Sequence, residues 1–156
     1  MKTISVRKGE ILQYKGDLNG KVYTVETGLL RSYSIDDKGK EHIFIFAPEG
    51  WIIADFNPTD VPCELFIDAL EDSTITVREK DLQKRMLDVS LLTKRISVLQ
   101  KRVIMLMSFS AIERYEHFIA TYPNIIKRVP QKMIASYLGI TPEALSKVKG
   151  DKARGK

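Results

Sequence analysis

The chain has 156 residues, of which 44% are hydrophobic and 29% charged, a composition typical of a globular domain with a real hydrophobic core. No stretch approaches the ~20 consecutive apolar residues needed to cross a bilayer. The first residues also lack the apolar run of a signal peptide, so we expect a cytoplasmic protein with no membrane partner. The single cysteine, Cys63, excludes an internal disulfide and any multi-cysteine metal or iron–sulfur site.

Charge is divided unevenly along the sequence. Residues 1–87 hold 12 Lys and Arg against 15 Asp and Glu, whereas residues 88–156 hold 13 against 5. The second part is therefore strongly basic, and this asymmetry favours contact with a polyanion through that part alone. Charge that serves only solubility is the alternative interpretation.

Residues 1–87 have the pattern of β-structure. Apolar and polar residues alternate through KVYTVETGLLRSYSI (21–35) on both sides of a turn at 26–28, and another turn cluster occupies 36–40. A loop rich in Pro and Asp follows at 56–64, and LFIDALEDSTITVRE (65–79) predicts two further strands. Short strands separated by Gly-containing turns are typical of an antiparallel sandwich or roll.

The periodicity then becomes helical. EKDLQKRML (79–87) predicts a short helix, and residues 88–110 predict a long one. The long helix has apolar residues at the heptad spacing of a coiled coil, so we expect it to form a homodimer. A single wide stripe packed within one chain is the alternative. The seam is Leu92, Ile96, Leu99, Val103 and Leu106, and a second stripe that could face the β-domain is Leu91, Val98 and Met105.

A third region, 111–156, begins with a capping box, Ser110-Ala111-Ile112-Glu113, which starts a helix that runs to about Tyr122. Pro130 suits the first position of the next helix. The spacing of Ala135, Gly139 and Leu145 then fits a helix-turn-helix, with a small residue at the helix crossing, a turn residue tolerant of positive φ, and an apolar residue that packs back.

The second helix of this motif is predicted over about 142–149, with Thr141 as N-cap and Pro142 at the first helical position. Its polar side chains suit base edges and phosphates, whereas a helical hairpin buried in another bundle would not need a basic exposed face. The candidate DNA-binding residues are Gln131, Lys132, Thr141, Glu143, Ser146, Lys147 and Lys149.

The stretch RVPQKMIASYLGITPEALSKVK (128–149) is similar to the corresponding stretch of Crp/Fnr (cyclic-AMP receptor-like) transcription regulators, in particular those of Bacteroidetes-type bacteria. ETGLLRSYSIDDKGKEHIFIFAPEGWII (26–53) and ALEDSTI (69–75) resemble the β-roll of the same family. The resemblance implies an α+β fold: an N-terminal antiparallel β-roll of the cyclic-nucleotide-binding jelly-roll kind, a long dimerisation helix and a C-terminal helix-turn-helix. It also implies double-stranded DNA with a pseudo-palindromic operator as partner.

Two sites depart from the family pattern. In the recognition helix, the family often has Arg, then Glu, then a second Arg; here Pro142, Glu143 and Lys147 stand in those places, so the target site should differ. The phosphate cassette of cyclic-nucleotide members is matched by Ala54-Asp55 and Cys63-Glu64, which lack the arginine that grips phosphate. We therefore expect a degenerate ligand pocket at these four residues that does not bind a cyclic nucleotide. Asp55 is interpreted as a surface acid, and a group that binds a ribose-like diol is the alternative.

These features predict a homodimeric, sequence-specific DNA-binding regulator without a metal or cofactor, whose small-molecule effector, if any, is unidentified. The alternative is a small-molecule-sensing β-roll dimer with weak or lost DNA binding. An enzyme is not expected, because His42 and His117 cannot form the metal cluster of a β-roll enzyme, and both are interpreted as solvent-facing residues. The β-wing that often follows the recognition helix has no counterpart in the sequence. A flexible basic arm could replace some of its phosphate contacts, formed by Lys149, Lys152, Arg154 and Lys156.

Overall fold

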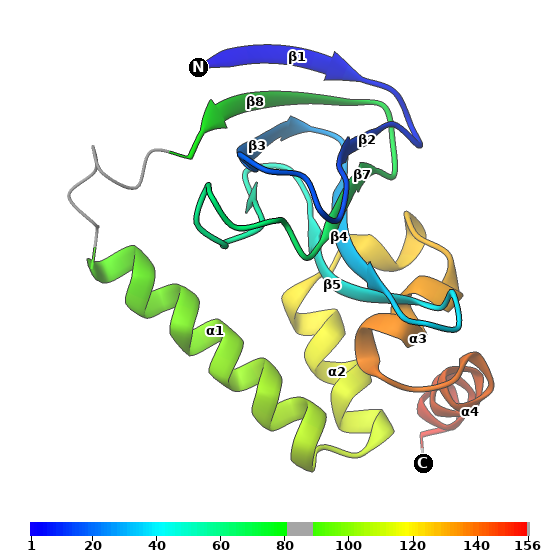
Figure 1. Ribbon diagram of the computed structural model, residues 1–156. Coiled ribbons are helices and arrows are strands. Elements are labelled where there is room, and N and C mark those ends of the chain that lie inside the picture. Colours follow the sequence, from blue (N-terminus) through cyan, green and yellow to red (C-terminus); the bar gives the residue numbers. More distant parts are fainter. Residues whose placement is uncertain (81–88, 156) are drawn as a thin grey trace. The chain divides into compact units, whose positions relative to one another are not determined.

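A computed structural model describes residues 1–80 and 89–155 of the chain. The chain divides into two compact units, Met1–Leu82 and Gln83–Lys156, of which the first is built of strands and the second of helices (Figure 1). The predicted α+β fold is therefore confirmed in its order of elements. No helix in the two described ranges is both long and apolar enough to cross a membrane.

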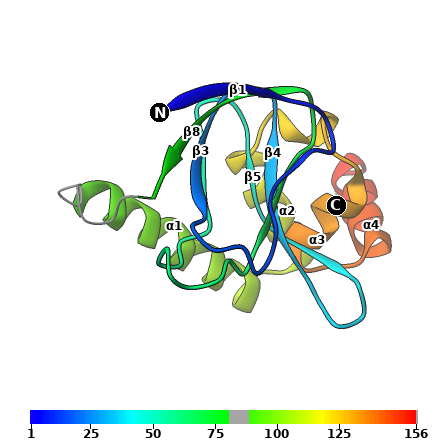
Figure 2. The same ribbon diagram turned by 45° about the horizontal axis from the view of Figure 1, so that its top comes forward.

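Within residues 1–80, eight strands form two four-stranded antiparallel sheets, with strand orders β1-β8-β3-β6 and β2-β7-β4-β5. Figure 2 shows β1, β8 and β3 running side by side. This arrangement is the antiparallel sandwich or roll that the alternation of apolar residues predicts. The strands are β1 (Lys2–Val6), β2 (Ile11–Gln13), β3 (Lys21–Thr27), β4 (Leu30–Ile35), β5 (Glu41–Ala47), β6 (Ile52–Ile53), β7 (Phe66–Ala69) and β8 (Ser73–Glu79).

Most strands that follow each other in sequence pass from one sheet to the other, whereas β4 and β5 pair with each other in one sheet. The turn between β3 and β4 crosses against the turn between β7 and β8, where the Leu29 N–H donates to Ser73 Oγ at 3.2 Å. Gly28 lies at this crossing with φ +93°, and a Cβ there would stand 2.1 Å from Ser73 Oγ. Only glycine fits, because the backbone is left-handed and the opposite turn leaves no room for a side chain.

The core of the β-unit lies between the inner faces of the two sheets. Alternation along each strand directs every second residue inward, so both sheets contribute side chains. The fully or almost fully buried apolar residues of this core are Val6, Tyr23, Val25, Leu30, Ile45, Ala47, Ile53, Ile67, Ala69 and Ile75.

The helical unit contains α1 (Val89–Ser108), α2 (Ala111–Thr121), a short 3-10 turn (Ile125–Lys127), α3 (Gln131–Leu138) and α4 (Pro142–Ala153). The predicted capping box is present, since Glu113 N–H donates to Ser110 Oγ and the Glu113 carboxylate accepts from the Ser110 N–H at 2.8 Å. Helices α2, α3 and α4 pack on one another around three aromatic rings whose centroids lie 5.3 to 5.6 Å apart. These rings belong to Phe118, Tyr122 and Tyr137.

Two helix predictions need comment. The second helix of the helix-turn-helix was expected to end near residue 149, but α4 continues to Ala153 because Gly150 keeps helical geometry and no stop residue intervenes. The short helix expected over 79–87 falls almost wholly on residues outside the described part of the chain. The compact division places α1 with the other helices, whereas the sequence predicts boundaries at 87/88 and 110/111.

Candidate nucleic-acid interface

The turn between α3 and α4 depends on Gly139. Its φ of +65° and ψ of 32° are left-handed, and the Ile140 N–H donates back to the Ala135 carbonyl at 3.0 Å. A left-handed residue closed by such a bond ends a helix abruptly and redirects the chain. The sequence therefore predicted this corner correctly from a single glycine.

The two helices of the corner are held by small and apolar side chains. Ala135 is 1% exposed on α3 and Leu145 is completely buried on α4, as the motif spacing predicted. Ile134, Leu138 and Val148 are also buried, so one face of α4 packs against the rest of the unit and the other is free.

The start of α4 is fixed by its cap. Thr141 has extended backbone and its Oγ1 accepts from the Ala144 N–H at 3.2 Å, while Pro142 occupies the first turn. Both features were predicted. The cap satisfies one of the amide groups that a helix start leaves unpaired, and Pro142 has no N–H to satisfy.

The exposed face of α4 carries the predicted contact residues. Glu143, Ser146 and Lys147 are exposed and are spaced by three and four residues, which places them on the same side of the helix. Thr141 at the start of α4, and Gln131 and Lys132 at the start of α3, are exposed as well. The face therefore combines a carboxylate acceptor, a hydroxyl and an ammonium group, which are the groups that read base edges and hold phosphates.

Lys149 does not fit the prediction as well as the others. It is half-buried, because it lies one helical turn after the completely buried Leu145 and so borders the packed face. The flexible basic arm is also wrong in part. Lys149 and Lys152 belong to α4, and Lys152 Nζ lies 3.1 Å from the Glu116 carboxylate on α2. Lys156 lies outside the described residues.

Two arginines that are not among the predicted site residues contact the helices next to this face. Arg114 on α2 donates to three backbone carbonyls, those of Leu106 and Phe109 at the end of α1 and that of Leu138 at the end of α3. The guanidinium of Arg102 on α1 lies 3.9 Å from the centroid of the Tyr137 ring. Residues that bond helix ends leave no periodic signal in the sequence, although a cation near the unpaired carbonyls of a helix C-terminus is generally stabilising.

In the β-unit, three of the four residues of the predicted ligand pocket, Ala54, Asp55 and Cys63, are buried, and Glu64 is exposed. Asp55 is 3% exposed, and its Oδ2 accepts from the backbone N–H groups of Glu64 and Leu65 at 2.7 and 3.0 Å. Its interpretation as a surface acid is therefore wrong, because the carboxylate closes the 56–64 loop. Ala54 and Cys63 are each 2% exposed. Burial, with the nearby Asp55 carboxylate, raises the pKa of the Cys63 thiol.

The histidines differ from each other. His42 is exposed on β5 as expected, with Nε2 2.8 Å from the Asp36 carboxylate. His117 on α2 is half-buried, and its Nδ1 has no hydrogen-bond partner among the described residues, so the expectation of a solvated side chain is wrong. Within the described ranges, no three His, Cys, Asp or Glu side chains gather as a metal site would require.

The chain was compared with known proteins. No protein-family profile matches it. It is 25% identical to the anaerobic regulatory protein of Haemophilus influenzae over 93% of this chain and 64% of that protein. It is likewise 25% identical to the fumarate and nitrate reduction regulatory protein of Salmonella typhimurium, over 93% and 66%. The chain thus spans about two thirds of the length of these relatives.

Solved structures agree. FixK2 of Bradyrhizobium japonicum matches with a TM-score of 0.79 at 21% identity, over 99% of this chain and 85% of that one. A CRP/FNR-family transcriptional regulator of Thermus thermophilus matches with a TM-score of 0.74 at 17% identity, over 99% and 87%. In sequence and fold, the chain is similar to Crp/Fnr-type regulators. The narrower resemblance to Bacteroidetes-type members stays a prediction.

Proposed function

We propose that this Crp/Fnr-type chain is a homodimeric, sequence-specific DNA-binding transcription regulator, with α4 as its recognition helix. The observation that carries the proposal is the free face of α4: Glu143, Ser146 and Lys147 are exposed beside one another, while Leu145 and Val148 hold the opposite face in the core. A helix held on one side and polar on the other is what the major groove accepts.

The charge supports a nucleic-acid partner. Residues 88–156 carry 13 basic against 5 acidic residues, and binding to a polyphosphate releases counterions. The N-terminus of α4, next to Glu143, also presents a positive dipole end. Lys132 stands at the start of α3 and Lys147 in the middle of α4, where each could hold a phosphate or a guanine edge.

The homodimer is supported by α1. Four members of the predicted seam, Ile96, Leu99, Val103 and Leu106, are 64%, 37%, 54% and 37% exposed, and the side chain of Leu92 lies outside the described part. A continuous apolar seam on a surface helix is typical of a protein–protein contact. The second predicted stripe is divided, since Met105 is buried and Val98 is 54% exposed. Two recognition helices in such a dimer would read half-sites about one DNA turn, ~34 Å, apart.

Selection of binding sites from random double-stranded DNA tests the proposal. We expect enrichment of a pseudo-palindrome, and affinity that falls steeply as salt rises. Lys147→Ala should weaken binding about tenfold or more and reduce the salt slope by about one. Lys40→Ala, which removes the same charge from an exposed turn of the β-unit, is the matched control and should bind like the wild type.

The variant Glu143→Ala tests base discrimination separately from overall DNA affinity. A carboxylate that accepts from a cytosine amino group contributes about 1–3 kcal/mol of discrimination, so this variant should tolerate other bases at one position per half-site. Absence of any enriched sequence, together with no binding at low salt, would contradict the proposal and favour the alternative of a small-molecule-sensing dimer with lost DNA binding.

A further inference from the structure

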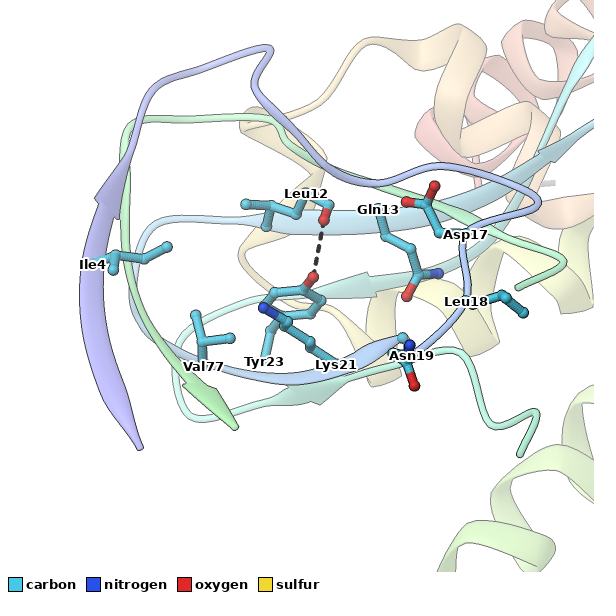
Figure 3. Close-up of a pocket in the computed structure, with 10 residues that line it drawn as sticks. Ile4, Leu12, Gln13, Asp17, Leu18, Asn19, Lys21, Tyr23 and Val77 are labelled. Atoms are coloured by element: carbon cyan, nitrogen blue, oxygen red, sulfur yellow. Dashed lines mark hydrogen bonds between the residues drawn. The ribbon is translucent and has the colours of Figure 1, made fainter. Parts of the chain in front are cut away.

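The β-unit contains a cavity of about 320 Å³ that none of the sites above uses. It lies between the β1-β8-β3 sheet and the segment that runs from β2 into the following loop (Figure 3). Its volume is at the lower end of the range for small-molecule sites. Its lining includes Ile4, Leu12, Gln13, Asp17, Tyr23 and Val77.

The side-chain amide of Gln13 is the feature that points to a ligand. Gln13 is 2% exposed and its Nε2 donates to the Leu65 carbonyl at 2.8 Å, but its Oε1 is buried without a hydrogen-bond partner among the described residues. Figure 3 shows this amide directed into the cavity. A buried carbonyl oxygen that lacks a donor is costly, so a donor group that occupies the cavity would be stabilised there.

An irregularity in the backbone of β2 sets the direction of the Gln13 side chain. The pairing of β2 with β7 shifts between Ile11 and Gln13, which leaves an extra residue on β2. Such a bulge redirects the side chain that follows it and is common next to binding sites. The bulge and the unpaired oxygen are independent observations that concern the same residue.

The rest of the wall is apolar on one side. Ile4, Leu12 and Val77 line the cavity together with the Tyr23 ring. The Tyr23 hydroxyl donates to the Leu12 carbonyl at 2.9 Å, so its proton is already used. Burial, with the nearby Cys63, Asp17 and Glu79, raises the pKa of Tyr23 to about 12, so this hydroxyl stays neutral at pH 7. A short aliphatic chain would fit against this wall.

The charged residues at the rim of the cavity determine which ligand charge is favoured. Lys21 also lines the cavity, but its ammonium lies 3.6 Å from the Glu79 carboxylate, which offsets its charge. The exposed Asp17 carboxylate lines the cavity as well, and its Oδ2 accepts from the Tyr14 N–H at 2.8 Å. The Lys80 ammonium lies close to Gly20, near Gln13 Oε1, but it is outside the lining and donates to the Asn57 carbonyl at 2.7 Å. Of the two charged residues in the lining, Lys21 has a carboxylate partner and Asp17 supplies the negative charge.

We propose that this cavity binds a small primary ammonium compound with a short aliphatic chain. The ammonium group donates to Gln13 Oε1 and faces Asp17, and the chain lies against Ile4, Leu12 and Val77. This binding function belongs to the β-unit and does not depend on the proposed recognition of DNA.

Nuclear magnetic resonance of the full ¹⁵N-labelled chain at pH 7 tests the proposal with three probes of equal length: n-butylamine, 1-butanol and butyrate. We expect n-butylamine to shift the backbone amide signals of Asn19 and Gly20 saturably, with a dissociation constant in the millimolar range, on the order of that expected for a five-atom ligand. Butanol should act more weakly at the same amides, and butyrate should not act.

Two variants probe the polar groups. Asp17→Asn keeps an oxygen that accepts from the Tyr14 N–H but removes the charge. It should therefore weaken the binding of n-butylamine about threefold to tenfold and leave the binding of 1-butanol unchanged. Asp37→Asn, at an exposed turn in the same unit, is the matched control and should change neither. Gln13→Met removes the acceptor and should abolish the saturable shifts, with the dispersion of the spectrum showing that the unit is folded.

Other outcomes would overturn the proposal. Equal shifts from amine, alcohol and carboxylate would show an unselective apolar void. No saturable shift from any probe at about 100 mM, roughly a hundredfold above a millimolar constant, would show that the cavity holds water only. Saturable binding by Gln13→Met as strong as that of the wild type would remove Gln13 from the site.

Discussion

Arg114 on α2 donates from Nη1 to the carbonyl oxygen of Leu138, the last residue of α3, at 3.0 Å. The same guanidinium bonds the carbonyls of Leu106 and Phe109, each at 2.9 Å. One cation thus satisfies orphan acceptors where α1 ends and where the helix-turn-helix corner begins. The proposed dimerisation helix α1 and helix α3, which precedes the proposed recognition helix, are therefore both tied to α2 through one side chain.

Replacement of Arg114 should loosen this connection. Three charge-assisted hydrogen bonds are lost in Arg114→Leu, and because the group is only half-buried we expect a loss of about 2–3 kcal/mol in the free energy of unfolding. Chemical denaturation of the full chain measures it. Lys101→Leu, which removes an exposed cation from α1, is the control and should lie within about 0.5 kcal/mol of the wild type. Equal losses in the two variants would refute the role given to Arg114.

The two glycines around the recognition helix should respond to alanine with opposite signs. Gly139→Ala places a Cβ on a left-handed residue, which costs about 1 kcal/mol, although the nearest atom, Leu106 Cδ2, is an ordinary 3.4 Å away. Gly150 lies inside α4, where a Cβ would meet Arg154 Nη2 at an ordinary 4.0 Å, so Gly150→Ala should stabilise the protein by about 0.5–1 kcal/mol. Thermal unfolding of both variants decides; a shift in the same direction would show that backbone conformation does not control these positions.

Local sequence signals predicted most of what lies in the helix-turn-helix. A cap, a proline and a left-handed glycine act on neighbouring residues, so Thr141, Pro142 and Gly139 could be placed without the fold. The strands were also visible from alternation. What could not be predicted is which sheet each strand joins, because β3 and β4 are adjacent in sequence but pair in different sheets.

The missed functional groups share a physical cause. Asp55 and Arg114 are charged residues whose partners are backbone groups, and the identity of those partners is set by loop and helix ends that only the folded chain brings together. The error at Lys149 is smaller, since its position one turn after Leu145 is readable from the helix period. The unpaired Gln13 oxygen depends on a bulge, which leaves no mark in the sequence pattern.

The capping box should make stability depend on pH. Hydrogen bonds from the side chain and the backbone N–H of Ser110 lower the pKa of Glu113 below its ordinary 4.5. A lowered pKa in the folded state stabilises the protein above the unfolded value and loses this contribution as pH falls through the folded one. Glu113→Gln keeps a capping acceptor that does not titrate. The stability advantage of the wild type over this variant should therefore be largest near pH 6 and should shrink below pH 4.5, as followed by denaturation midpoints. A difference that is constant with pH would contradict this account.

The proposed dimer can be tested on the seam itself. Val103 is 54% exposed on α1, so a glutamate there is tolerated by a monomer but places two like charges at an apolar contact in a dimer. We expect Val103→Glu to sediment as a monomer at concentrations where the wild type is dimeric. Gln100→Glu adds the same charge at an exposed position off the seam and should stay dimeric. Dimers of unchanged strength in Val103→Glu would exclude this seam as the interface.

The ion pair between Arg31 and Asp68 should behave differently from the one between Arg31 and Glu41. Arg31 and Asp68 side chains are 7% and 10% exposed and are joined by two parallel hydrogen bonds of 2.8 and 2.9 Å, whereas the Glu41 side chain is 43% exposed. Burial lowers the pKa of Arg31, but the bonds to both carboxylates more than reverse this, so the guanidinium stays charged.

Removal of Asp68 therefore leaves a buried charge with one partner at the edge. We expect Asp68→Ala to cost about 3–5 kcal/mol in the free energy of unfolding, and Glu41→Ala only about 0–1 kcal/mol. The double variant Arg31→Met with Asp68→Leu removes both charges and fills the space, so it should recover most of the loss. Urea denaturation of the four proteins completes the comparison. If the double variant is no more stable than Asp68→Ala, the loss comes from packing around the strands and not from the unpaired guanidinium.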